Sequence, residues 1–186
     1  MLFFGSSFHN TGLFSIRSAG RIGSVNKPII NPHNLHIDGF FATAMNGQND
    51  GVIVDVDVRE LSINGLIIND HEDIADQEEL VRLQPIINLK FELIGKTVYV
   101  GKSKVGKVED YVVDTKSLFI QKFYVQPSLL KSVNTGQMIF DRQSIVEVTD
   151  KKIVVSGPEQ SVKNFISQKL PSSSSLSSAS TSSISE

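Results

Sequence analysis

The stretch Gly101–Val108, GKSKVGKV, carries glycine and lysine at the spacing of a phosphate-binding loop. Such a loop ends in Lys-Ser or Lys-Thr and opens a helix, whose amide groups and side-chain hydroxyl hold phosphate and magnesium. Here Val108 stands in place of the hydroxyl residue, and the β-branched run EDYVVD that follows predicts a strand. We therefore predict no nucleotide site and give Gly106 a structural role, in a turn or in a bulge of a strand.

Histidines offer a second kind of chemistry, a zinc site. His33 and His36 are three residues apart, and Asp70 and His71 lie further along the same half of the chain. Zinc needs three or four converging ligands. The histidine pair flanks a predicted hairpin turn, where exposed polar side chains are expected. We predict that it holds no metal.

A pair of aspartates offers a third, acid–base catalysis. Asp55 and Asp57 alternate with valines in VDVDVRE, which predicts a strand with both carboxylates on one face. The matching positions in the second half of the chain are Arg142 and Ser144, so a solvated strand face is favoured. No catalytic triad spacing, hydrolase elbow or zinc-protease signature occurs in the sequence. We predict a non-enzymatic protein without catalytic residues, metal ligands or cofactors.

Lysines form the most conspicuous cluster, at Lys102, Lys104 and Lys107, and we expect Lys96 to extend it along the edge of a sheet. Three tyrosines lie close to it in the sequence: Tyr99, Tyr111 and Tyr124. Such an edge could contact RNA phosphates through salt-dependent interactions. The alternative, which we favour, is a sheet edge that its lysines protect against strand-to-strand aggregation.

An internal repeat places these residues in a fold. At an offset of 83, which sets Gly23 on Gly106, the segment from Gly20 to Phe41 aligns with the segment from Ser103 to Tyr124. At an offset of 87, which sets Glu60 on Glu147, residues 52–68 align with 139–155. The other matching pairs are Val25 with Val108, Asn31 with Asp114, Leu35 with Leu118, Ile37 with Ile120, Phe40 with Phe123, Phe8 with Phe91 and Gly12 with Gly95.

Each copy is predicted to consist of short strands separated by turns, as in a small barrel or sandwich. In the second copy we place strands at 96–100, 104–114, 118–126, 137–141, 145–148 and 152–155. The turn DTKS joins the second and third strands, and NPHN does so in the first copy. Pro28 and Pro32 have no N–H to donate, which favours a sheet edge there.

Both copies close on the spacing of a capping box, Asn69 with Glu72 and Ser156 with Glu159, so a short helix is expected after each. The first helix falls on DIADQEELVRL. The second falls on SVKNFISQKL, whose one-sided stripe consists of Val162, Phe165, Ile166 and Lys169. The serine-rich end, residues 171–186, predicts disorder.

The segment SLFIQKFYV is apolar on both faces of a regular strand. Alternation sets Leu118, Ile120 and Tyr124 on one face and Phe119, Phe123 and Val125 on the other. A small barrel hides one of these faces. The second must be covered by the other copy, by the short helices or by a partner, which makes Phe119 and Phe123 candidate contact residues.

Composition sets wider bounds on the class of protein. The 186 residues include no cysteine, so disulfides and thiolate metal sites are excluded. No apolar run is long enough to span a bilayer, and the N-terminus has no secretory signal, so we expect a cytoplasmic protein. The net charge is −2, with an acidic first half and a basic second half, and does not mark the whole chain as a nucleic-acid binder.

The second copy resembles the PRC-barrel family, through Gly106, Lys107, Val108, Asp110, Asp114 and the closing KKIVV. The first copy is similar more loosely, through Gly23, Val25, Asn31 and VRELSINGLII. The resemblance implies small, twisted, mostly antiparallel β-barrels. It also implies binding to other macromolecules, as in a photosynthetic reaction-centre subunit and a ribosome-maturation factor. The chain looks most like prokaryotic proteins of two such barrels.

We therefore predict an all-β protein of two tandem PRC-type barrels, at residues 1–73 and 91–158. A helix and linker at 74–90, a second helix at 159–170 and the tail at 171–186 complete it. The predicted function is to bind or scaffold a protein partner, with Lys102, Lys104, Lys107, Phe119 and Phe123 as candidate contacts and Gly23 and Gly106 as structural turn residues. The alternative is an RNA- or ribosome-associated factor that uses the basic second barrel.

Overall fold

Strands dominate the structure, a computed structural model that describes residues 1–45, 50–127 and 136–156, so the predicted all-β class is confirmed. The first sheet has the strand order β5-β4-β3-β2-β7-β6. Its strands are β2 (Thr11–Ser15), β3 (Gly20–Ile30), β4 (Ile37–Ala44), β5 (Asp50–Val54), β6 (Glu60–Ser62) and β7 (Gly65–Ile68). The predicted helix at 159–170 and the tail at 171–186 lie outside the described residues.

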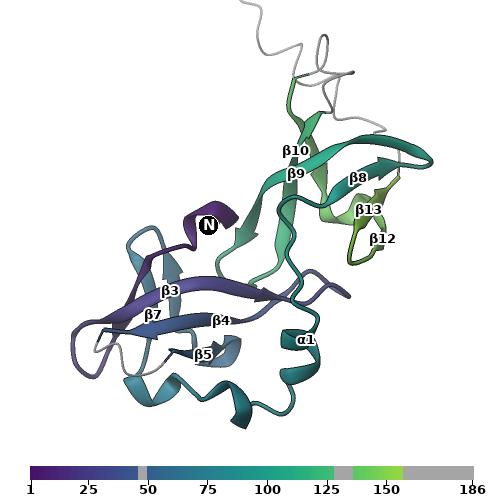
Figure 1. The fold of residues 1–186 in the computed structure, drawn as a ribbon. Helices are drawn as coiled ribbons and strands as arrows, with labels where there is room; N and C mark the ends of the chain where they lie inside the picture. Colours follow the sequence, from purple (N-terminus) through teal and green to yellow (C-terminus); the bar gives the residue numbers. More distant parts are fainter. Residues whose placement is uncertain (46–49, 128–135, 157–186) are drawn as a thin grey trace, which may run out of the picture.

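The second sheet repeats this order as β11-β10-β9-β8-β13-β12 (Figure 1). Its strands are β8 (Thr97–Val100), β9 (Ser103–Asp114), β10 (Ile120–Pro127), β11 (Met138–Asp141), β12 (Ile145–Val148) and β13 (Lys152–Val155). All six strands predicted for this half are present, and each begins and ends within two residues of its predicted position. In both sheets the described pairings are antiparallel except one, between β2 and β7 or between β8 and β13.

The pairing register repeats as well, with one difference from the expected alignment. Glu60 pairs with Ile67 as Glu147 pairs with Val154, in agreement with the offset of 87. In the first strand of each sheet, Leu13 pairs with Gly23 as Val98 pairs with Gly106. The expected matches of Gly12 with Gly95 and of Phe8 with Phe91 are therefore wrong by two residues. The reason is the β2–β3 turn, residues 16–19, which is two residues longer than the β8–β9 turn at 101–102.

Gly23 and Gly106 lie inside strands, beside β-bulges, and not at a reversal of the chain. Of the two roles considered for them, turn or bulge, the structure shows the bulge. The pairing of β2 with β3 skips Ile22, and that of β8 with β9 skips Val105, the residue directly before each glycine. Residues 101–108 therefore form the β8–β9 turn and the start of β9, as predicted, and do not open a helix as a phosphate-binding loop does.

Both glycines also allow a close approach of backbone. A Cβ atom on Gly23 would lie 2.3 Å from the Thr43 carbonyl oxygen in β4, and one on Gly106 would lie 2.1 Å from the Gln126 oxygen in β10. Thr43 and Gln126 are matching residues at the offset of 83. The same steric requirement therefore explains both glycines.

One hydrophobic core runs through both sheets. It includes Leu13 and Phe40 from the first sheet, Phe8 from the segment before β2, and Phe123 and Ile153 from the second sheet. At the junction, Ile120 donates its backbone N–H to the Leu35 oxygen, and Ile37 donates to the Leu118 oxygen, both at 3.0 Å. Since these are matching residues, the bridge obeys a pseudo-two-fold symmetry.

The bridge depends on an unusual backbone conformation. Leu35 and Leu118 have φ values of +58° and +54°, in the left-handed region that branched side chains rarely occupy. Both side chains are buried in the shared core, at 3% and 5% exposure. Burial of two leucine side chains, roughly 1.5–3 kcal/mol each, offsets a strain of the order of 1–3 kcal/mol per residue.

The segments that precede each sheet cross over to the other sheet. Strand β1 (Leu2–Phe4) pairs antiparallel with the Val112–Asp114 end of β9. Helix α1 (Gln84–Asn88), which precedes β8, packs on the first sheet, where Ile87 is buried with Ile29. The predicted boundary after residue 73 therefore separates segments that pack together.

The segment after β7 departs from the single helix predicted over 73–83. The capping box is formed one residue later than expected, by Asp70 and Asp73, and begins only a 3₁₀ turn at His71–Asp73. Ala75 then exchanges two backbone hydrogen bonds with Val52 on the edge of β5, at 2.9 and 3.0 Å. This bridge holds the chain extended, so that helix α1 forms only at Pro85 and its neighbours.

Two predicted strand patterns are also wrong. Asp55–Asp57 form a 3₁₀ turn and not a strand, because the chain must pass there from β5 at one edge of the sheet to β6 at the other. In β10, register shifts interrupt the alternation. They set Ile120, Phe123 and Val125 on the same buried face.

We expect Gly106→Ala to destabilise the protein by about 1–3 kcal/mol, the usual cost of overpacking, because the new methyl group meets backbone that cannot turn away. Gly23→Ala should behave alike. Gly136→Ala is the matched control, since a Cβ there meets no atom of the described residues within 4 Å. Urea unfolding of the three variants measures this, and equal midpoints for Gly106→Ala and Gly136→Ala would contradict the close approach.

Candidate functional site

The outer face of the second sheet carries a group of lysines, which we call the lysine face: Lys102, Lys104, Lys107 and Lys152. In-register pairing sets Lys152, Thr97 and Lys107 in one row across β13, β8 and β9. Val154, Tyr99 and Lys104 form the next row. Lys102 stands in the adjoining β8–β9 turn, and Lys102, Lys104 and Lys107 are all exposed.

Lys152 is the member of the lysine face that the structure shows in a close ion pair. Lys152 forms an ion pair with Glu147 at 3.1 Å, with both side chains more than 40% exposed, so the pair contributes little stability. Glu109 accepts a hydrogen bond from Gln137 at 2.7 Å. A shallow hollow of about 480 Å³ lies beside the face, lined by Thr97, Tyr99 and residues 149–152. A flat, basic surface with a half-buried tyrosine suits an extended anionic partner.

Two expectations about these lysines are wrong. Lys96 does not extend the cluster, because it is 9% exposed, donates to the Asp150 carbonyl oxygen at 2.6 Å and lies 4.3 Å above the Phe91 ring. Burial lowers the pKa of its ammonium group. The explanation by edge protection fails as well, because β9 is an interior strand between β8 and β10.

The matching face of the first sheet has an apolar centre in place of lysines. There Ile67, Phe14 and Arg21 form the row that corresponds to Val154, Tyr99 and Lys104. The Phe14 ring covers two glycines of the neighbouring row, since a Cβ atom on Gly12 or Gly65 would lie 2.8 or 2.6 Å from it. We call this surface, with Phe14, Ile16, Gly65 and Ile67, the Phe14 face. It surrounds a hollow of about 320 Å³.

Exposed apolar side chains flank the Phe14 face. Ile16, in the β2–β3 turn, is 58% exposed, and Ile63, between β6 and β7, is 77% exposed. Both turns contribute residues to the hollow. Contiguous exposed apolar surface of this kind is typical of protein–protein contacts. Sequence reasoning missed it, although the glycines of TGLFS and NGLII were a signal for an aromatic ring packed on bare backbone.

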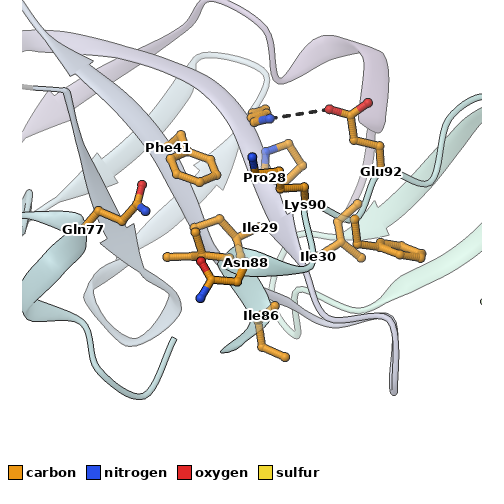
Figure 2. Close-up of a pocket in the computed structure, with 12 residues that line it drawn as sticks. Pro28, Ile29, Ile30, Phe41, Gln77, Ile86, Asn88, Lys90 and Glu92 are labelled. Atoms are coloured by element: carbon orange, nitrogen blue, oxygen red, sulfur yellow. Dashed lines mark hydrogen bonds and ion pairs between the residues drawn. The ribbon is translucent and has the colours of Figure 1, made fainter. Parts of the chain in front are cut away.

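A cleft of about 450 Å³ lies between β3 and the segment around α1 (Figure 2). Ile29, Ile86 and Phe41 give it an apolar lining. At its rim, Lys27 forms an ion pair with Glu92 at 3.5 Å and lies 5.5 Å from the centre of the Phe41 ring. The cleft can receive an apolar side chain next to an exchangeable ion pair.

Prolines set the chemistry of the strand edge along this cleft. In the second sheet the matching edge is occupied by β1, and Thr115 donates its N–H to the Met1 oxygen at 2.9 Å. The residue that matches Thr115 at the offset of 83 is Pro32, which has no N–H to donate. The cleft therefore disfavours the addition of a strand, as expected for the edge around Pro28 and Pro32.

The two candidate phenylalanines have different environments. Phe123 is fully buried in the core, so it is not accessible to a partner of the folded protein. Phe119 is half-buried at the junction between the sheets, in an edge-on contact with His36 at 4.7 Å and beneath the Arg142 guanidinium at 4.5 Å. Its partners are therefore within the molecule.

The histidines and aspartates do not converge on a metal site within the part of the chain that the structure describes. The His36 ring nitrogens lie 2.7 Å from the Asp38 carboxylate and 3.9 Å from the Asp55 carboxylate. These contacts connect the turn after β5 to the junction between the sheets. His33 is exposed, and its backbone N–H donates to the Asn31 side-chain oxygen at 3.0 Å. Asp57 is on the 3₁₀ turn, where burial raises the pKa of its carboxyl.

Asp70 and His71 have a structural role. The Asp70 carboxylate accepts from the His71 ring and backbone, at 2.7 Å each, and from Arg17 at 2.6 Å. The contacts with His71, followed by that with Arg17, lower the pKa of Asp70 to about 2. They connect the β2–β3 turn to the start of the segment that caps β5.

Comparison of the sequence with models of protein families and with curated proteins found no match in either case. The structure itself shows a protein of two sheets whose six-strand paths have the same order. Among the described residues, no helix is long and apolar enough to cross a membrane.

The carboxyl of Asp70 should titrate at about pH 2, below its ordinary value of 3.8. Because the folded-state pKa is the lower one, this group stabilises the fold above pH 4, and its contribution is lost as the pH falls from about 4 to 2. His71→Ala and Arg17→Ala should each raise the pKa. Carboxyl-carbon NMR measures it, and a wild-type titration near 3.8 would contradict the hydrogen-bonded arrangement.

Proposed function

We propose that the protein is a non-enzymatic scaffold of two PRC-type β-barrels, which holds a protein partner on the Phe14 face, in the cytoplasm of a prokaryote. The observation that carries this proposal is the contrast between matching faces. Strand order and register are the same in both units, yet one outer face carries lysines and the other has an apolar centre around Phe14. A framework that stays constant while its outward side chains change is typical of binding modules.

The geometry of the Phe14 face supports a protein partner. Its hollow is shallow and lined by apolar side chains and small residues. Ile16 lines it from the β2–β3 turn, and the exposed Ile63 is in the β6–β7 turn, which contributes Asn64 to the lining. Burial of apolar side chains in such a hollow provides most of the free energy of a protein contact.

The lysine face favours a second candidate function, contact with RNA or a ribosome. Lys102, Lys104 and Lys107 are exposed on one side of the molecule, next to the half-buried ring of Tyr99. Three phosphate contacts by single-stranded RNA would give a slope of about −2 in a plot of log affinity against log salt concentration, at roughly −0.7 per contact.

Affinity capture with matched variants separates the two functions. Ile16→Glu with Ile63→Glu alters the Phe14 face, and Lys102→Glu, Lys104→Glu and Lys107→Glu alter the lysine face. A control variant has the same change in charge as the lysine variant, at residues that are exposed elsewhere: Arg82→Glu, Lys90→Glu and Lys116→Glu.

We expect a captured partner that stays bound after nuclease treatment and in 0.5 M salt, which is roughly the level at which surface charges are screened. Of the three variants, only the isoleucine variant should fail to capture it. Loss with the lysine variant, nuclease and salt would establish the RNA function instead. Retention of the same partner by all three variants would contradict both proposals.

A further inference from the structure

Two hollows meet at the ion pair between Lys27 and Glu92. The cleft between β3 and α1 lies on one side of this pair, and a hollow of about 220 Å³ lies on the other. The lining passes from one hollow to the other at the pair on both walls, which are residues 26–30 of β3 and residues 90–94 after α1. We call the cleft and the second hollow together the Lys27 groove.

The Lys27 groove has apolar walls on both sides of the ion pair. The side chains that form them are aliphatic or aromatic: Ile29, Ile86 and Phe41 in the cleft, and Phe8, Phe91 and Ile94 in the second hollow. Ile94 is 44% exposed, so part of this wall is accessible from solvent. A concave site with apolar walls and a few charged groups is typical of a binding site.

Basic groups outnumber acidic ones along the groove. Among the described residues that line it, Glu92 is the acidic one, whereas Lys27 and Lys90 are both basic (Figure 2). The ion pair between Lys27 and Glu92 is 3.5 Å long, and both side chains are more than half exposed. Such a pair contributes little stability. An incoming carboxylate can therefore replace Glu92 at the Lys27 ammonium group.

We propose that the Lys27 groove binds an extended segment of a protein partner, in which an acidic residue stands between two apolar residues, each two positions away. The carboxylate binds Lys27, and the apolar side chains enter the cleft and the second hollow. Side chains two positions apart in an extended chain share a face and lie roughly 6.5–7 Å apart. The Lys27 ammonium lies 5.5 Å from the centre of the Phe41 ring, which is close to this repeat.

The central position of the charge favours a peptide over simpler ligands. A fatty acid has its carboxylate at one end and cannot place apolar groups on both sides of Lys27. A nucleic acid has a phosphate at every residue, which the apolar walls oppose. Pro28 lines both hollows and has no N–H to donate, so the segment is held by its side chains and not as an added strand.

The proposal is independent of the proposed function. The Lys27 groove and the hollow of the Phe14 face have no lining residue in common. Variants of one surface therefore leave the other unaltered, and each proposal can fail without the other.

Fluorescence anisotropy of labelled peptides with the full chain tests the spacing. The probe is Gly-Ser-Leu-Ser-Glu-Ser-Leu-Ser-Gly. A second peptide of the same composition has its glutamate one position earlier, and a third has glutamine in place of glutamate. We expect the probe to bind about tenfold more tightly than either, because only the probe places a carboxylate at Lys27 with both leucines in the hollows.

Variants of the groove test the residues. Lys27→Glu should weaken binding of the probe by about tenfold, and Lys116→Glu, at an exposed turn elsewhere, should leave it unchanged. Ile94→Asp should weaken it as well, whereas Ile16→Asp on the Phe14 face should not. Glu92→Gln removes the competing carboxylate and should strengthen binding by about threefold, a gain that a misfolded variant cannot produce.

Equal affinities for the three peptides would overturn the proposal, and so would unchanged binding of the probe by Lys27→Glu. Weaker binding by Glu92→Gln would show that the ion pair is needed intact and would also overturn it. Displacement of the probe by decanoate would assign the groove to a small anionic amphiphile instead. Displacement by an oligouridylate would assign it to a nucleic acid.

Discussion

The reciprocal backbone bridge between Leu35–Ile37 and Leu118–Ile120 is the constraint on which the rest of the structure depends. It fixes the two sheets by matching atoms, and it buries two leucines whose backbone conformation is unfavourable by itself. Because the two units contribute equally, any surface on one unit stands in a defined orientation to its counterpart on the other. Strand β1 and helix α1 strengthen this arrangement by crossing between the units. The strain at the leucines is tolerated because both side chains enter a core that neither sheet forms alone.

A fixed frame of this kind leaves the outward side chains free to differ. The bulge glycines Gly23 and Gly106 serve the same close approach in both sheets and leave little room for change. On the outer faces of the sheets, Phe14 and Tyr99 occupy matching positions. Phe14 lies on the Phe14 face, whereas Tyr99 lies on the lysine face. The cleft at Lys27 is a third difference, since it lies where the second sheet receives β1. One frame thus presents several chemically distinct surfaces, which is the physical basis of the scaffold that we propose.

Much of the fold could be predicted from the sequence, because strands, turn residues and the repeat are local signals. The hairpins at NPHN and DTKS and all six strands of the second half follow from such signals.

The predictions that failed depended on contacts between residues distant in sequence. Ala75 is held extended by Val52, so a helical pattern there gave no long helix. Lys96 has the sequence context of a surface residue, but Asp150 and Phe91 enclose it. Bulges in β10 moved Phe123 into the core, which no alternation rule anticipates. Of the candidate contacts, the three lysines remain on the surface, and the Phe14 face required the structure to be recognised.

Differential scanning calorimetry of the full chain tests most directly whether the shared junction unites the two sheets. The account predicts a single transition whose calorimetric and van't Hoff enthalpies agree, because neither sheet can unfold without breaking the bridge and the common core. Leu118→Gly, which removes the side chain from the junction, should lower the midpoint of the whole transition. Two separate transitions in the unaltered protein, one for each sheet, would contradict the account.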